Sequence, residues 1–103
     1  MTKAEPVVVK SLEALDALVD KHVFGWEFTE PTAFYSTDIA AAWEVVEELD
    51  LSMYPLACTV GWRFEFDRNE GAEAETAPLA ICLAALKAKG INVTLGLPET
   101  ERR

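Results

Sequence analysis

Hydroxyl side chains stand where two predicted helices begin, which is a place where a protein can bind a phosphate. Ser36-Thr37 precedes one of these helices and Thr76 precedes the other. The first N–H groups of a helix have no partner within it, and together with the helix dipole they favour an anion. If both helices begin at the same edge of a sheet, aromatic and cationic side chains complete a nucleotide pocket. The candidate ligand-binding residues are Trp26, Tyr35, Ser36, Thr37, Arg63 and Thr76.

The same residues also have a simpler interpretation. Ser, Thr and Asp at a helix start cap the free N–H groups, which stabilises a helix by about 0.5–2 kcal/mol. Under this interpretation the aromatic side chains belong to the core, and we expect the same of Trp43 and Trp62 because both fall on apolar stripes. The sequence leaves both interpretations open.

Nucleophilic and metal-ligating residues are few. His22 is the single histidine, and Cys58 and Cys82 lie far apart in the chain. A zinc site needs about four nitrogen or sulfur ligands at suitable spacing, and a catalytic cysteine or serine needs a base beside it. The acidic run Glu47-Glu48-Asp50 resembles a solvated helix face more than a cation site. We therefore expect no enzyme activity, no metal and no cofactor, and two reduced thiols in the core.

The charge balance of the chain is strongly acidic. Eighteen Asp and Glu stand against nine Lys and Arg, for a formal net charge of -9. Such a field repels a nucleic-acid backbone, so we expect no direct DNA or RNA binding. It suits a basic protein partner if the acidic side chains converge, although a solvated acidic surface is the commoner case. The candidate partner-binding residues are Glu44, Glu47, Glu48, Glu70 and Glu73, with Asp67 and Glu75 beside them.

Three segments have the spacing of helices. Apolar residues recur on one face of residues 12–24, between the cap Ser11 and the stop Gly25. Residues 38–49 follow with a stripe that includes Ile39 and Trp43, and residues 77–89 form a third helix. These helices must position the hydroxyl side chains described above.

Strand patterns occupy much of the remaining chain. Residues 54–67 alternate with period two and predict two antiparallel strands that turn near 59–61. Residues 26–28 and 33–35 predict a short hairpin or bent edge, and residues 91–97 predict a last strand. Residues 67–75 read as a mobile acidic loop, whereas residues 6–9 fit either an edge strand or an arm.

These elements predict one domain of the α+β class. A chain of 103 residues suits a single core, which we place at about residues 11–97, with residues 1–5 and 98–103 flexible. The predicted architecture is an αβα sandwich, with three helices and about three to five mostly antiparallel strands in a small sheet between helices. Residues 1–6 lack the apolar stretch of a signal peptide, and the sequence contains no apolar run of about 20 residues, so we expect no membrane contact and a cytoplasmic location.

Three motifs stand out in the chain: Leu15 to Val19 with Gly25-Trp26, Tyr35 to Val46, and Glu75 to Ala88. Together they resemble the phage ABA sandwich domain family of small phage and prophage proteins. The similarity covers about residues 14–92, and the segment between Trp26 and Tyr35 is shorter than in many relatives. It implies a small sheet packed between helices and a phage or prophage origin, and it carries no established activity or catalytic residues.

We therefore expect a non-enzymatic accessory binding protein in the cytoplasm of an infected or lysogenic bacterium. Antagonism of a host defence is the leading hypothesis, by analogy with other small accessory phage proteins. Such antagonism could work by either of two mechanisms: masking of a host protein by the acidic surface, or sequestration of a nucleotide signal at the helix ends. The alternative from another class is a small structural or assembly protein that acts as a homo-oligomer.

Overall fold

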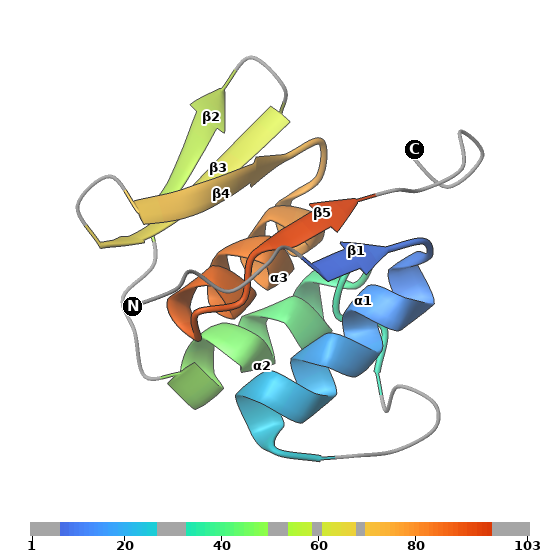
Figure 1. Cartoon of the computed structure of the whole chain (residues 1–103). Coiled ribbons are helices and arrows are strands. Elements are labelled where there is room, and N and C mark those ends of the chain that lie inside the picture. Colours follow the sequence, from blue (N-terminus) through green and yellow to red (C-terminus); the bar gives the residue numbers. More distant parts are fainter. Residues whose placement is uncertain (1–6, 27–32, 50–53, 59–60, 68–69, 96–103) are drawn as a thin grey trace, which may run out of the picture.

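A computed structural model describes residues 7–26, 33–49, 54–58, 61–67 and 70–95 of the chain. These residues form three α-helices, a π-helical turn and five strands (Figure 1). The α+β class predicted from the sequence is confirmed. The termini predicted to be flexible, residues 1–5 and 98–103, lie outside the described residues.

The first helical segment consists of α1 (Leu12–Val19), which continues into the π-helical turn η1 (Asp20–Phe24). Ser11 caps it, because its side-chain oxygen accepts a hydrogen bond from the N–H of Ala14 at 3.1 Å. Gly25 ends it with a φ of 78°, a left-handed conformation that glycine adopts without a steric penalty. The predicted limits of this segment are confirmed.

The second helix, α2 (Ile39–Leu49), starts close to its predicted position but buries a different face. Its buried residues are Ala41, Ala42 and Val45, whereas Trp43 remains 45% exposed. Asp38 is its capping residue, since the N–H of Ala40 donates to the Asp38 carboxylate at 2.9 Å. The expectation that Trp43 belongs to the core is therefore wrong. Small side chains on the buried face let α2 approach its neighbour closely, which leaves the indole outside.

The third helix, α3 (Ala77–Ala88), is the centre of the molecule. It is apolar on nearly all sides, as a helix surrounded by protein must be, and Ile81, Cys82 and Leu86 are fully buried. Thr76 occupies the N-cap position with extended backbone, but its side chain makes no capping hydrogen bond. Pro78 is tolerated because it lies in the first turn, where the backbone nitrogen needs no partner.

Three antiparallel strands cover α3 from one side: β2 (Tyr54–Cys58), β3 (Gly61–Asp67) and β4 (Glu70–Ala74), in the order β2-β3-β4. The two predicted strands that turn near residue 60 are confirmed as β2 and β3. The predicted loop over residues 67–75 is wrong, because most of it forms β4. Gly71 permits the pairing, since a Cβ there would lie 2.9 Å from the Cα of Glu65.

Trp62 corrects a second expectation about the core. It lies on the same face of β3 as the buried Phe64, with ring centroids 6.4 Å apart, yet it remains 41% exposed. The face of β3 that these two residues share is thus buried at Phe64 but not at Trp62.

A second, parallel pair joins the two ends of the chain. β1 (Val7–Val9) pairs with β5 (Val93–Leu95), with Val7 opposite Val93. Of the two interpretations of residues 6–9, the edge strand is thus the one observed. The hairpin predicted for residues 26–28 and 33–35 is absent from its described part: residues 35–37 form a turn, and Asp38 N–H donates to Phe34 O at 2.9 Å. Residues 27–32 lie outside the described part.

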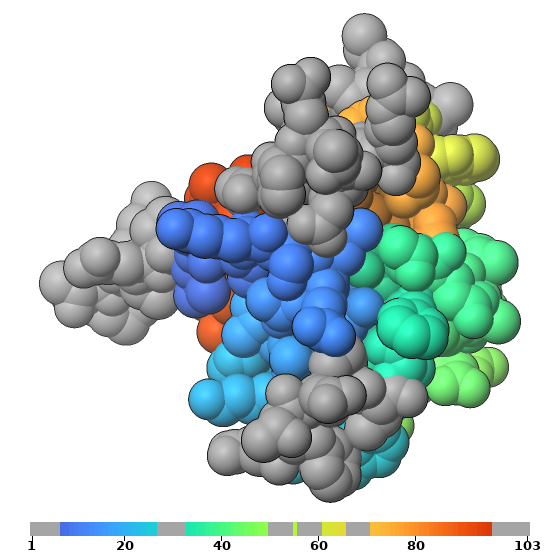
Figure 2. Space-filling view, turned by 90° about the vertical axis from the view of Figure 1, so that its right-hand side faces the viewer, coloured from blue at the N-terminus to red at the C-terminus, as the bar shows by residue number. Residues whose placement is uncertain are grey.

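The layers are visible in Figure 1, where α3 lies between α2 and the β2-β3-β4 sheet, and the β1-β5 pair lies beside that sheet above α1. Residues 33–49 and α1 share one face of the molecule in Figure 2. Within the described ranges, no helix is both long and apolar enough to cross a bilayer.

Candidate functional site

Tyr35 and Ser36, two of the predicted ligand residues, anchor the turn before α2 to the first helical segment. The Tyr35 hydroxyl donates to the Asp20 carboxylate at 2.7 Å, and the Ser36 N–H donates to the Asp16 carboxylate at 2.8 Å. All four residues are buried. The N–H that the sequence suggested for an anion is thus bound to an internal carboxylate.

The electrostatics of this cluster are unfavourable for a phosphate. Burial raises the pKa of Asp16 from 3.8 to about 6, although the polar groups of Ser36 lower it, and Asp20 and Glu13 raise it further. The hydroxyl oxygen of Ser36 is buried next to the Asp16 carboxyl group. Two carboxyl groups at this point repel an added anion, so the cluster has a structural role in holding the turn to α1 and η1.

Phe24, which is not among the predicted ligand residues, connects the two predicted aromatic ones. The Phe24 ring stacks on Trp26 at 4.9 Å between centroids and on Tyr35 at 5.5 Å. Tyr35 forms the buried end of this stack and Trp26 the outer end, 44% exposed. The i, i+2 spacing of Phe24 and Trp26 around Gly25 is the signal that could have suggested it.

The other predicted ligand residues lie elsewhere. Arg63 is in β3 and pairs with Glu65 at 2.7 Å and with Glu73 at 3.5 Å, on the opposite side of α3 from α2 (Figure 1). Thr37 and Thr76 are exposed. The nucleotide pocket stays a prediction, and the contacts of its six residues lend it no support.

The predicted acidic residues divide between two faces. Glu44, Glu47 and Glu48 are exposed on α2. Glu73 is exposed in β4 and pairs with Arg63, while the side chain of Glu70 lies outside the described part. The five glutamates therefore do not form one surface around α2.

Large apolar side chains accompany the three glutamates of α2. Ile39 and Trp43 lie one turn apart on the same side of the helix, and Ile39 is 51% exposed. Phe34, just before the helix, is 68% exposed. We name this set the α2 surface; its members are Phe34, Ile39, Trp43, Glu44, Glu47 and Glu48.

Nucleophilic and metal-binding groups are not assembled in the described residues. Burial raises the pKa of the Cys82 thiol well above its usual range, so this side chain stays protonated. The side chain of Cys58 lies outside the described part. No group of three or more His, Cys, Asp or Glu within the described ranges is placed to hold a metal ion.

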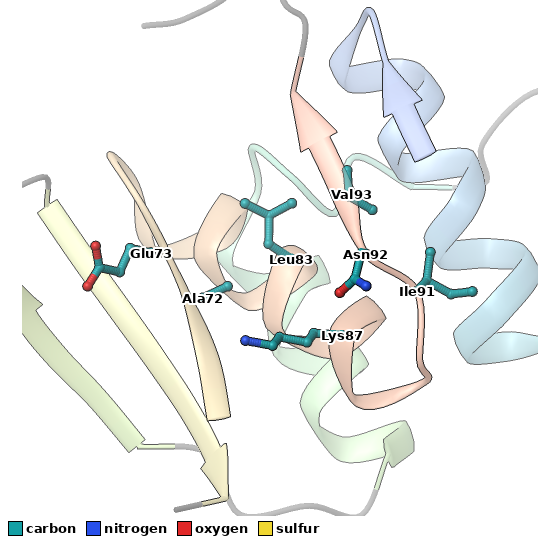
Figure 3. Close-up of a pocket in the computed structure, with 7 residues that line it drawn as sticks. All are labelled: Ala72, Glu73, Leu83, Lys87, Ile91, Asn92 and Val93. Carbon is teal, nitrogen blue, oxygen red and sulfur yellow. The ribbon is translucent and has the colours of Figure 1, made fainter. Parts of the chain in front are cut away.

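A groove separates β4 from β5 above α3 (Figure 3). Its volume is about 290 Å³, and Lys87 on its floor donates to the carbonyl oxygen of Gly71 at 3.2 Å. This groove was not predicted, because the residues of β4 have the composition of a loop. The lining residues are Ala72, Glu73, Leu83, Lys87, Ile91, Asn92 and Val93.

Comparison with known proteins identifies a family and a solved structure that this chain resembles. The model of the phage ABA sandwich domain family matches residues 4–86, which include most of the described helices and strands. The crystal structure of a phage protein from Bacillus cereus superimposes with a TM-score of 0.72 at 23% identity, over 91% of this chain and 98% of the other. No curated protein matches. The fold thus agrees with the predicted αβα sandwich domain.

Proposed function

The chain belongs to the phage ABA sandwich domain family, and from this premise we propose that it is a phage accessory protein that masks a host protein with its α2 surface. The observation that carries the proposal is the exposed pair Ile39 and Trp43 beside Glu44, Glu47 and Glu48. Antagonism of a host defence in the bacterial cytoplasm is the role that we infer for this binding.

The composition of the α2 surface supports a protein partner. Trp is enriched among the residues that dominate interface energies, and such a residue is usually surrounded by polar side chains that exclude water. Trp43 is 45% exposed, on the side of α2 turned away from its buried residues Ala41 and Val45. A rigid helix also presents the indole at a low cost in conformational entropy.

The charge of the surface indicates a basic partner. Three glutamates lie on α2, and the chain as a whole carries a net charge of -9. Complementary charge accelerates association and makes it sensitive to salt. A nucleotide is a less suitable ligand, because the carboxyl groups of Asp16 and Asp20 already bind Ser36 and Tyr35 of the predicted pocket and would repel a phosphate.

The experiment uses the purified chain to capture partners from a lysate of its bacterial host, followed by affinity measurement on the identified partner. Trp43→Ala should weaken binding by about 30-fold or more, as expected of an interface residue worth at least ~2 kcal/mol. Glu47→Lys should weaken it more at low salt than at high salt. Glu75→Lys is the matched control, because Glu75 is exposed at the end of β4 beside Gly61, in the sheet on the opposite side of α3 from α2.

Unchanged affinity of Trp43→Ala for a partner that the wild type binds would refute the masking mechanism. The nucleotide alternative predicts a higher melting temperature with a nucleotide panel, since a ligand at about 100 times its Kd adds ~2.7 kcal/mol.

A structural or assembly role is the second candidate, and the outer strand β1 favours it. Val8 is 56% exposed there, and Val7 is also exposed. An apolar edge strand can pair with a second copy. Native mass spectrometry distinguishes the two candidates, since the assembly role requires a homo-oligomer at micromolar concentration and the masking role does not.

A further inference from the structure

Two edge strands face each other across α3 without pairing. Among the described strands, β4 pairs with β3 and β5 pairs with β1, and no pairing joins β4 to β5. The groove between them has apolar side chains from Ala72, Leu83 and Val93 and polar ones from Glu73, Lys87 and Asn92 (Figure 3). A strand edge bordering such a groove is a template for another extended chain.

Backbone groups of both strands point into this groove. Val7 N–H donates to Asn92 O at 2.7 Å, so Asn92 faces β1 and the next residue, Val93, faces the groove. On the other side, Gly71 O accepts from Lys87 in the groove, and alternation along the strand turns Glu73 the same way. The peptide groups of three residues are thus available to a new strand.

We propose that the groove binds an extended segment of a partner protein, which adds a strand between β4 and β5 and joins the two sheets. Backbone hydrogen bonds would supply the affinity and alternate side chains the selectivity. Side chains directed at α3 meet Leu83 and must be apolar. Side chains directed outward lie next to Glu73.

The negative charge of this protein favours basic residues at the outward-facing positions of the bound segment. Glu73 is 45% exposed, and its contact with Arg63 is long at 3.5 Å. Opposite charges on neighbouring strands stabilise a sheet, whereas like charges destabilise it. Since the chain also has a net charge of -9, the bound segment alternates apolar with basic residues.

Lys87 protects the free edge until the segment binds. Its ammonium group satisfies Gly71 O, and a lysine at a strand edge discourages non-specific pairing. An N–H of the incoming strand replaces the ammonium group at this carbonyl. A segment that binds here must therefore replace the hydrogen bond between Lys87 and Gly71 O, which disfavours weakly binding segments.

The test uses a synthetic peptide of about six residues in which valine and lysine alternate, with amide exchange measured by NMR on the whole chain. Binding should slow the exchange of the Gly71, Glu73 and Val93 amides, and leave that of Thr94, which faces β1, unchanged. A peptide that alternates valine with glutamate should bind at least about tenfold more weakly.

Two variants separate this proposal from the α2 surface. Leu83→Lys places a charge on the groove floor and should weaken peptide binding by about tenfold or more, with the fold verified by its NMR spectrum. Glu48→Lys makes a charge change on α2 and should lower the affinity much less. Glu73→Lys, exposed and tolerant, should reverse the preference between the two peptides.

Several results would overturn the proposal. Equal binding of both peptides, no protection of the three amides, or unchanged affinity in Leu83→Lys would each do so. A concentration-dependent dimer that Leu83→Lys abolishes would also overturn it, because the occupant would then be a second copy of this chain. None of these results affects the Trp43→Ala test of the α2 surface, so the two proposals can fail independently.

Discussion

Replacing Asp16 by asparagine isolates the free-energy cost of one buried charge. The amide oxygen of asparagine can still accept the Ser36 N–H that Asp16 accepts at 2.8 Å, so the turn before α2 keeps its anchor. Only the ionisable group is lost. Three titratable groups influence Asp16 or lie near it: Asp20 and Glu13 on its own segment, and Cys82, which stays protonated, on α3.

The magnitude follows from the pKa. The pKa of Asp16 is about 6 in the folded chain and near 3.8 when unfolded, so the folded state binds the proton more tightly. The contribution of Asp16 to stability therefore falls as the pH rises from about 4 to about 6 and is constant above that. A pKa that is higher by about two in the folded chain corresponds to a free-energy difference of ~3 kcal/mol at most. Solvent screening reduces this to about 1–2 kcal/mol.

The assay is urea unfolding of wild type and Asp16→Asn, followed by tryptophan fluorescence at several pH values from 4 to 7. Relative to the variant, the wild type should lose about 1–2 kcal/mol of unfolding free energy across this range. At pH 7 the variant should be the more stable protein. Glu48→Gln, which neutralises an exposed carboxylate, is the control and should follow the wild type.

A variant with the same pH dependence as the wild type would refute the reasoning. So would a variant that is less stable than wild type at pH 7 by more than about 1 kcal/mol, because the carboxylate would then stabilise the fold in its charged form.

Three further substitutions test the packing. Tyr35→Phe removes the hydroxyl bonded to Asp20 at 2.7 Å and should cost about 1–3 kcal/mol in urea unfolding; a change under ~0.5 kcal/mol would show that the bond is not structural. Ala85→Leu enlarges a fully buried side chain and should cost about 1–3 kcal/mol, whereas Ala40→Leu, exposed on α2, should change stability by less than ~0.5 kcal/mol. Gly61→Ala should lower the melting temperature because φ is 142° there and a Cβ would lie 2.6 Å from a backbone oxygen; an unchanged value would contradict this backbone conformation.

The helices and one turn could be predicted because their signals are local. Ser11 and Gly25 bound the first helical segment through caps that involve only neighbouring residues. Gly61 sits where β2 turns into β3 for a similar reason, since few other residues adopt its φ. The family resemblance agreed with these elements.

The orientation of α2 and the existence of β4 required tertiary information. Residues 39–49 are apolar on more than one side, so the sequence permits a stripe through Trp43 or one through Ala41 and Val45. The close approach of α3, with its many alanines, selects the smaller side chains. Glu70 to Ala74 has low strand propensity, and it pairs because β3 and α3 cover it.

The sequence by itself determined the α+β class, the limits of the helices, the acidic charge and the absence of an obvious catalytic motif. It could not show that Asp16 and Asp20 anchor Ser36 and Tyr35, because those bonds join residues 20 and 15 positions apart. Exposure of Trp43 and the opening of a groove between β4 and β5 likewise depend on how distant elements pack. Local propensities act over a few residues, whereas these sites form only where the whole chain has folded around α3.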